Sequence, residues 1–373
     1  MKKQILLKIF FTFIILTFGS CSDPIFKTIS QEEKQLEPHI KGSPTNFVVL
    51  NGNMYVGSGT TLYRYKGTNP SNPAIGRWDD IPNVGNNGNI RQLAATSTFM
   101  YLLCGESGRN VLRKSSNGNS WANVHVPDDI LVQSVYAANN QLFIGTGNYS
   151  SYSIYEYDGN NFTFLINSKN MLLNGVAYDS NNSVFYLIAK DIDAETGNIF
   201  KYTAGSLPEQ IPSSNPFMGI ISLGNSIVAI SRNGILCNIG PNISPGPRLN
   251  GDGSSDKLAT GALEIWTDPN TSRKLLLAGR QDKMNYSVNY LQGYQELELE
   301  NGKIKAGAAF RDPGLHSLST VDNNASYKTN MEKNPVNYLY QDSSDHILFA
   351  STQTNGVWSY RLRGDRWLWN AEQ

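Results

Sequence analysis

One pattern recurs along most of the chain: an apolar run, a polar turn, and then a strand-like run that alternates apolar and polar residues. The segments "NGNMYVGSGTTLYRYKG" and "NNQLFIGTGNYSSYSIYEYDG" show it clearly. The last apolar residues of seven such runs align at Val56, Cys104, Ile144, Ile188, Ile230, Leu277 and Phe349. Their spacings are 48, 40, 44, 42, 47 and 72 residues. Five of the six fall within roughly 40–50 residues, a length that accommodates four short strands.

This spacing predicts an all-β fold, namely a single β-propeller with seven four-stranded blades. One small twisted sheet cannot bury both of its faces, whereas seven sheets packed in a ring can, and a closed ring leaves only short protected edges. The 72-residue spacing equals one blade plus an insertion, which we place at about residues 306–335. A pair of β-sandwiches or a solenoid is the alternative, although four short strands per repeat fit those folds less well.

Alternation at period two marks the third strand of several units. The segments "LYRYKG", "IYEYDG" and "WSYRLRG" place apolar side chains on one face and polar side chains on the other. The second strands are apolar throughout, as expected of a strand buried on both faces. Gly and Asn between the runs supply the backbone conformations that tight turns require.

The composition fits a turn-rich β protein with a neutral polar surface. Aromatic residues make up 11% of the chain and charged residues only 17%. Basic and acidic residues number 31 each, and the chain without its first 20 residues keeps 28 basic against 31 acidic residues. This balance lacks the basic footprint of a nucleic-acid-binding domain, so we expect no nucleic-acid partner.

The first 20 residues are typical of an export signal. Lys2, Lys3 and Lys8 form a positive n-region, and residues 9–18 form a mostly apolar run. A transmembrane helix needs roughly 20 apolar residues to cross the hydrocarbon core, so this run is too short for one. We therefore expect a signal peptide over residues 1–20.

The small pair Gly19 and Ser20, directly before Cys21, resembles the lipobox of bacterial lipoproteins. Phe18 departs from the usual pattern, which prefers Leu at that position. The resemblance implies cleavage before Cys21, diacylglycerol on the Cys21 sulfur and a third acyl chain on its amine. Two or more chains give stable membrane anchoring.

The stretch at residues 21–46 is polar with scattered Pro and Gly, so we interpret it as the lipidated cysteine and a flexible tether. The propeller is then expected over residues 47–373. Ser22 follows the cysteine, so the chain lacks the Asp-type signal for retention in the inner membrane. We therefore expect the protein at the outer membrane, either periplasmic or surface-exposed.

Cys104 and Cys237 remain once Cys21 is lipidated, and both lie in strand-like runs of non-adjacent blades. A disulfide needs Cα atoms within about 7 Å of each other. We therefore expect two buried free thiols. The sequence contains no CxxC and no Cys/His cluster, which argues against zinc.

The segment "KSSNGNSW" resembles a degenerate Asp-box, the hairpin motif that is repeated in sialidase-type propellers. Gly118, Ser120 and Trp121 match the motif, whereas Lys114 and Ser116 stand in place of its Ser and Asp. The resemblance implies a structural hairpin with the tryptophan packed between sheets. It implies nothing about catalysis.

No catalytic constellation can be assigned from the sequence. A sialidase needs an early Arg-Ile-Pro-like segment, and the chain offers only the late "FRDPG". The acidic segment "DIDAETGN" fails as an EF-hand because its glycine falls one place late and Tyr202 stands where the closing Glu should be. A solvated loop or a weak calcium site remains open there. We expect no catalytic residue, no bound metal and no cofactor.

Propellers commonly bind ligands on the face built by the loops that join second to third strands and blade to blade. Tyrosine is enriched at such interfaces because it gives contact area at low entropic cost. The candidate binding residues lie in three of these loops: Tyr149, Tyr152, Asp191, Asp193, Arg280, Asp282 and Tyr286. Ordinary solvated loops are the alternative for each of them.

The chain thus resembles bacterial β-propeller lipoproteins with Asp-box-like or kelch-like blades. The resemblance implies a lipid-anchored, non-catalytic envelope protein whose propeller face binds a protein or glycan partner. Two alternatives stay open at this point. One is a scaffold for outer-membrane assembly, and the other is a glycan-active hydrolase or lyase built on a propeller.

Overall fold

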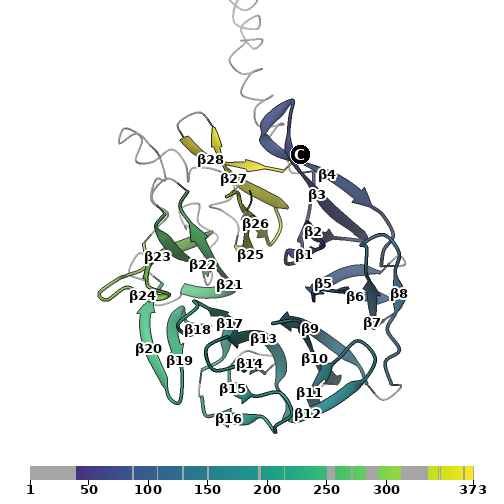
Figure 1. Cartoon of the computed structure of the whole chain (residues 1–373), viewed down its shortest axis with the longest axis vertical. Coiled ribbons are helices and arrows are strands. Elements are labelled where there is room, and N and C mark those ends of the chain that lie inside the picture. Colours follow the sequence, from purple (N-terminus) through teal and green to yellow (C-terminus); the bar gives the residue numbers. More distant parts are fainter. Residues whose placement is uncertain are drawn as a thin grey trace, which may run out of the picture. The chain divides into compact units, whose positions relative to one another are not determined.

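Seven short antiparallel sheets stand around a common axis in the computed structural model (Figure 1). The structure describes residues 39–372 apart from 86–87, 107, 128–129, 149–150, 192–194, 214, 250–256, 270–271, 283–292, 312–334, 343, 345 and 364–365. The expected signal peptide, Cys21 and most of the expected insertion lie outside the described residues. A helix long and apolar enough to span a membrane is not found in the described part of the chain.

Each sheet is a blade of four strands that follow one another in the sequence. Blade 1 contains β1 (Val48–Leu50), β2 (Asn53–Ser58), β3 (Thr61–Asn69) and β4 (Asn72–Ile81). Blade 2 contains β5 (Asn89–Ala95), β6 (Met100–Glu106), β7 (Arg109–Ser115) and β8 (Ala122–Asn123). Blade 3 contains β9 (Val132–Ala138), β10 (Gln141–Asn148), β11 (Ser151–Tyr157) and β12 (Phe162–Lys169).

Blade 4 contains β13 (Leu172–Asp179), β14 (Val184–Lys190), β15 (Gly197–Tyr202) and β16 (Glu209–Ile211). Blade 5 contains β17 (Phe217–Ser222), β18 (Ile227–Ser231), β19 (Ile235–Ile239) and β20 (Ile243–Arg248). Blade 6 contains β21 (Lys257–Thr267), β22 (Lys274–Asp282), β23 (Tyr294–Glu300) and β24 (Lys303–Ile304). Blade 7 contains β25 (Val336–Gln341), β26 (Leu348–Thr352), β27 (Val357–Arg363) and β28 (Arg366–Ala371).

The predicted seven-bladed, all-β propeller is therefore confirmed. All seven residues used to align the repeats fall in the second strand of their blade. Five consecutive residues are buried in each of β6 and β18, as expected of a strand covered on both faces. The three alternating segments form the third strands β3, β11 and β27.

The hydrophobic core lies between the blades rather than at the centre of the ring. The described residues form seven clusters, and each cluster joins two neighbouring blades. Cys104 packs between blades 1 and 2 and Cys237 between blades 4 and 5. Both are free and buried, as predicted, and burial raises the pKa of each thiol.

The Asp-box-like segment forms the hairpin between β7 and β8. The Asn117 side-chain oxygen accepts hydrogen bonds from the backbone N–H groups of Asn119 and Ser120, at 2.9 Å each. The Trp121 indole packs against the cluster between blades 1 and 2, and its N–H donates to the Gly118 carbonyl at 3.2 Å. The segment therefore has the structural role that the motif implies.

The ring closes between blade 7 and blade 1, where the described ends of the chain meet. Within the described residues, every blade takes its four strands from one continuous stretch, and none combines strands from the two ends of the chain. Instead, residues 39–45 run along blade 7. The Ile40 and Gly42 carbonyls accept from the backbone N–H groups of Val357 (3.2 Å) and Gly356 (3.0 Å). Ile40 is fully buried in the cluster that joins the two blades.

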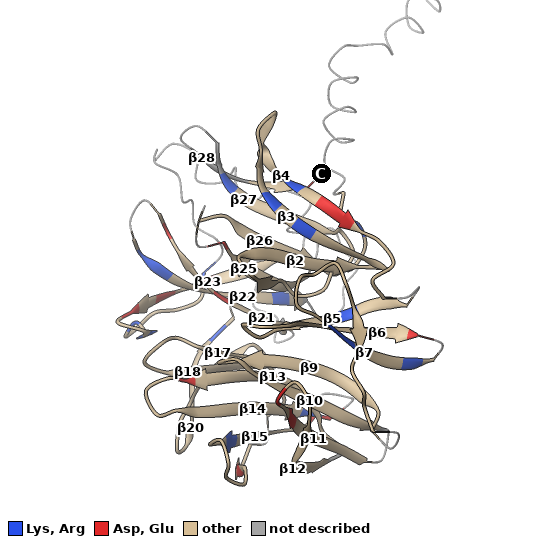
Figure 2. Ribbon diagram, turned by 45° about the vertical axis from the view of Figure 1, so that its right-hand side comes forward, with Lys and Arg blue, Asp and Glu red and all other residues tan. Residues whose placement is uncertain are grey.

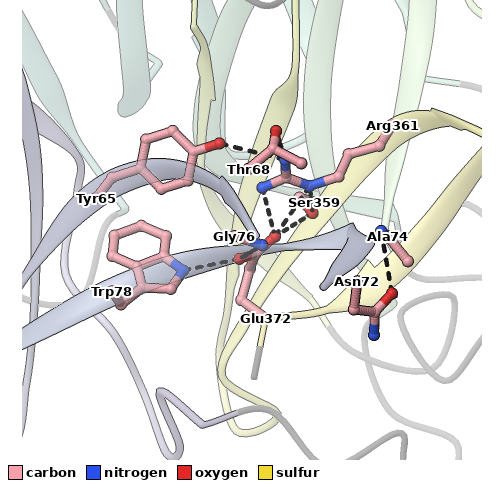
Figure 3. Close-up of polar contacts among 9 residues, drawn as sticks. All are labelled: Tyr65, Thr68, Asn72, Ala74, Gly76, Trp78, Ser359, Arg361 and Glu372. Carbon is pink, nitrogen blue, oxygen red and sulfur yellow. Dashed lines mark hydrogen bonds and ion pairs between the residues drawn. The ribbon is translucent and has the colours of Figure 1, made fainter. Parts of the chain in front are cut away.

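A buried ion pair completes this closure (Figure 3). Arg361 on β27 and Glu372, just after β28, are 2% and 0% exposed, and their side chains are 2.9 Å apart. The other carboxylate oxygen of Glu372 accepts from two groups of blade 1, the backbone N–H of Gly76 (2.6 Å) and the Trp78 indole (2.7 Å). Arg361 in turn donates to the Tyr65 hydroxyl at 3.2 Å. One carboxylate therefore binds both blades.

Another carboxylate, Glu264, is partly buried at the interface of blades 6 and 7. Strand alternation puts it on the same side of β21 as Ala262 and Trp266, which both belong to the cluster between these blades. Part of the side chain stays exposed, but the surrounding protein removes most of the water from the carboxyl group. Burial raises the pKa of Glu264 to about 8, while a hydrogen bond from the Ile265 N–H acts in the opposite direction.

Replacing Glu372 tests the closure. Removing one partner of a buried ion pair leaves the other charge uncompensated and typically destabilises a protein by about 3–5 kcal/mol. We expect Glu372→Gln to lower the free energy of unfolding by about 3 kcal/mol in urea titrations. The control is Asp79→Asn, which breaks the half-exposed Arg64–Asp79 pair of blade 1 (2.7 Å), where less than about 1 kcal/mol is expected. Equal losses in both variants would contradict the closure role.

Replacing Glu264 tests its pKa. The unfolded chain releases this proton near the ordinary glutamate value of 4.5, whereas the folded chain keeps it up to about pH 8. Stability contributed by the protonated group is therefore lost as the pH rises between these values, by up to about 1.4 kcal/mol per pH unit. Relative to the wild type, Glu264→Gln should gain stability from pH 5 to 8 and then level off. A difference that stays constant over this range would contradict the raised pKa.

Candidate functional site

An open pocket of about 510 Å³ lies between blades 2 and 3, on the face built by the loops that join second to third strands. This volume is within the range of roughly 300–1,000 Å³ that is typical of ligand pockets. Its lining comes from the starts of β5, β7, β9 and β11, from the β6–β7 turn and from the residue before β9. The lining residues are Arg91, Gly108, Arg109, Asn110, Leu131, Val132, Gln133 and Tyr152.

Two arginines give the pocket its charge. Arg91 is on β5, the innermost strand of blade 2, and Arg109 begins β7; both are exposed. Figure 2 marks Lys and Arg positions in blue on both of these strands. Within the described residues, neither guanidinium is hydrogen-bonded or ion-paired to another protein group. The Arg91 guanidinium packs so closely over Gly105 that a side chain at that glycine would meet it at 2.9 Å.

Two side-chain amides form a fixed wall of the pocket. The Asn110 side-chain nitrogen donates to the Val132 carbonyl at 2.9 Å and to the Gln133 side-chain oxygen at 3.3 Å. The Gln133 nitrogen donates to the Gly147 carbonyl at 3.0 Å. These bonds connect blade 2 to blade 3 and hold both amides in place before any ligand arrives.

An aromatic and an aliphatic side chain complete the pocket. Tyr152, on β11, is only 6% exposed and pairs with Gly147 across the hairpin. Gly147 has a φ of +136°, and a Cβ there would lie 2.2 Å from the Ser151 carbonyl, so this turn requires glycine. Leu131, by contrast, is 43% exposed at the edge of the pocket.

The structure places the sequence-predicted residues in different surroundings. Tyr152 lines the pocket. Arg280 is 3% exposed on β22 of blade 6, and Asp282 ends that strand with its side chain outside the described part. Three further candidates also lie outside the described residues: Tyr149, Asp193 and Tyr286.

Asp191, the remaining candidate, organises its own loop between β14 and β15. Its carboxylate accepts from the Glu195 N–H at 2.7 Å and from the Thr196 hydroxyl at 2.9 Å. Glu195 also pairs with Arg232 of blade 5 at 2.8 Å. Burial, and then the charge of Arg232, lower the pKa of the neighbouring Lys190. In the described part of the chain, no group of three or more His, Cys, Asp and Glu side chains could hold a metal ion.

Sequence reasoning missed Arg91, Arg109, Asn110 and Gln133. A signal for two of them was present, because "ESGRN" occupies the same position in blade 2 as the loops that were singled out in blades 3, 4 and 6. Arg91 and Gln133 gave no such signal. Each follows a buried residue at the start of an innermost strand, and only the register of the folded blades brings them to one pocket.

No protein-family model matches the sequence, and no curated protein sequence matches it. Solved structures share its fold. YCF48 bound to a D1 peptide has a TM-score of 0.53 and 11% identity, covering 88% of this chain and 96% of that chain. The WD40 propeller domain of Doa1 has a TM-score of 0.54 and 9% identity, covering 88% and 95%.

PorZ, a bacterial surface component of the type-IX secretion system of Porphyromonas gingivalis, is also similar. Its TM-score is 0.51 at 10% identity, and the match covers 91% of this chain and 39% of that chain. Similarity at such low identity shows the fold alone. The chain is a seven-bladed β-propeller of four-stranded antiparallel blades, distantly similar to the propellers of YCF48, WD40 proteins and PorZ.

Proposed function

We propose that this protein is a lipid-anchored envelope protein whose propeller binds a protein or glycan partner through the pocket between blades 2 and 3. One observation carries the proposal: two exposed arginines line a single pocket and, within the described residues, have no protein partner. Unpaired like charges in a concave site attract an oppositely charged ligand, because a cleft lined by one sign of charge concentrates its field.

The chemistry of the pocket supports binding rather than hydrolysis. Glycoside hydrolysis uses two carboxylates that flank the scissile bond. The described lining consists of arginines, amides, a glycine, aliphatic residues and a largely buried tyrosine. These groups recognise and orient a ligand, and none of them is an evident nucleophile or general acid.

Two structural neighbours give the proposal its context. YCF48 was solved with a D1 peptide bound, and PorZ is a component of a bacterial surface. Both are propellers of the same architecture. We extend peptide binding from YCF48, and a location at the envelope from PorZ, to this chain. The exposed arginines and fixed amides of its pocket are groups that can bind such a ligand.

The lipid anchor rests on the N-terminal sequence. A positive n-region, a short apolar run and a small pair before Cys21 together favour export and acylation at that cysteine. We place the protein at the outer membrane because Ser22 follows the cysteine. Its propeller would then be held near a membrane surface, where it meets envelope partners.

Site-specific crosslinking tests the binding face. A photo-crosslinking amino acid at Leu131, at the edge of the pocket, should yield a covalent adduct with an envelope component in living cells. The same group at Phe164, which is 54% exposed on the outer strand β12, is the matched control and should yield none. Adducts at neither position, or equally at both, would contradict a binding role for this face.

Metabolic labelling with a clickable palmitate tests the anchor. Wild-type protein should carry the label and fractionate with membranes, because the acyl chains provide the membrane affinity. Cys21→Ser should lose both properties. Cys104→Ala, which removes a free buried thiol, should keep both. Label that persists in Cys21→Ser would contradict acylation at Cys21.

A further inference from the structure

We infer that the pocket between blades 2 and 3 recognises a carboxylate on a peptide, supplied by a chain end or by an acidic side chain of a protein partner. This inference rests on the proposed function and adds the chemical class of the ligand. It follows from three features of the pocket: its uncompensated charge, its fixed amides and its exposed aliphatic edge.

The charge calls for an anion. Arg91 and Arg109 line the same pocket, and neither guanidinium is hydrogen-bonded or ion-paired to another protein group within the described residues. The whole chain balances 31 basic against 31 acidic residues, so this positive site is a local feature. A guanidinium presents a planar fork of donors that matches the two oxygens of a carboxylate.

The amides suit a peptide backbone. Both donor bonds of the Asn110 amide go to blade 3, to the Val132 carbonyl and the Gln133 side chain. Its oxygen atom has no hydrogen-bond partner within the described residues and can accept from a peptide N–H. Because the amide is already fixed, binding there needs little further ordering of side chains, which favours affinity.

The apolar groups favour a peptide over a glycan. Sugars commonly stack on an exposed aromatic ring, but Tyr152 is only 6% exposed and does not present its ring as a platform. Leu131 is 43% exposed beside the arginines and offers contact area for an aliphatic side chain. The pocket therefore combines a carboxylate site with a small apolar contact surface.

Fluorescence polarisation with three labelled peptides tests the inference on the full-length protein in detergent. The peptides are a Gly/Ser octapeptide ending in leucine with a free carboxylate, its C-terminal amide, and the same amide with an aspartate before the leucine. At least one of the two acidic peptides should bind. The neutral amide should not, and the acidic peptide that binds identifies the source of the carboxylate.

Arginine variants provide the matched comparison. Arg91→Gln and Arg109→Gln should each weaken binding roughly tenfold, since hydrogen bonds to charged groups contribute about that much. Arg77→Gln, at an exposed arginine on β4 of blade 1, should bind like the wild type. Unchanged thermal unfolding in all three variants shows that the fold is intact.

Several outcomes would overturn the inference. The neutral amide could bind as well as the acidic peptides, or neither acidic peptide could bind. Both arginine variants could bind the peptide as well as the wild type does. Inorganic phosphate or polygalacturonate could also displace the peptide when its phosphate or carboxylate groups are at the same concentration as the peptide carboxylate.

The Leu131 crosslink separates this inference from the proposed function. If the adduct persists in an Arg91→Gln, Arg109→Gln double variant, the face binds a partner by other means. If the wild type gives no adduct, the proposed function itself is wrong.

Discussion

The structure depends on how a ring of seven consecutive blades is closed. A propeller buries its apolar faces only between neighbouring blades, so an open junction would expose two of them. Glu372 prevents this by accepting hydrogen bonds from Gly76 and Trp78 of blade 1 while it pairs with Arg361 of blade 7. Residues 39–45 add backbone bonds along blade 7 at the same junction. The junction thus combines one buried ion pair with the surrounding apolar cluster, in which Ile40 is fully buried.

Packing between neighbouring blades also creates the candidate site. The pocket takes residues from blades 2 and 3, and neither blade could form it alone. Asn110 and Gln133 bridge the two blades, so the distance between the arginines of blade 2 and the aliphatic edge before blade 3 is set by interblade packing. The ion pair that closes the ring lies at a different junction. Side chains of the pocket can therefore vary without affecting closure.

The sequence predicts the architecture well because the repeat is a local property. The length of each unit, its apolar second strand and its alternating third strand are all readable along the chain, and so are the burial of Cys104 and Cys237 and the hairpin at Trp121. Pairings across blades are not readable. Trp78 and Glu372 are 294 residues apart, and Arg91 and Gln133 converge only once the strand register is set. Of the residues proposed for binding that the structure describes, only Tyr152 lines this pocket, whereas Asp191 accepts hydrogen bonds from Glu195 and Thr196.

The most direct test of the closure is the coupling energy between Trp78 and Glu372 across the junction. It comes from a double-mutant cycle of Trp78→Phe and Glu372→Gln, measured as free energies of unfolding. Because the Trp78 indole N–H donates at 2.7 Å to the carboxylate of the fully buried Glu372, the account predicts a coupling of about 0.5–3 kcal/mol. Additive effects, within about 0.3 kcal/mol, would show that the two blades do not depend on this carboxylate and would contradict the account.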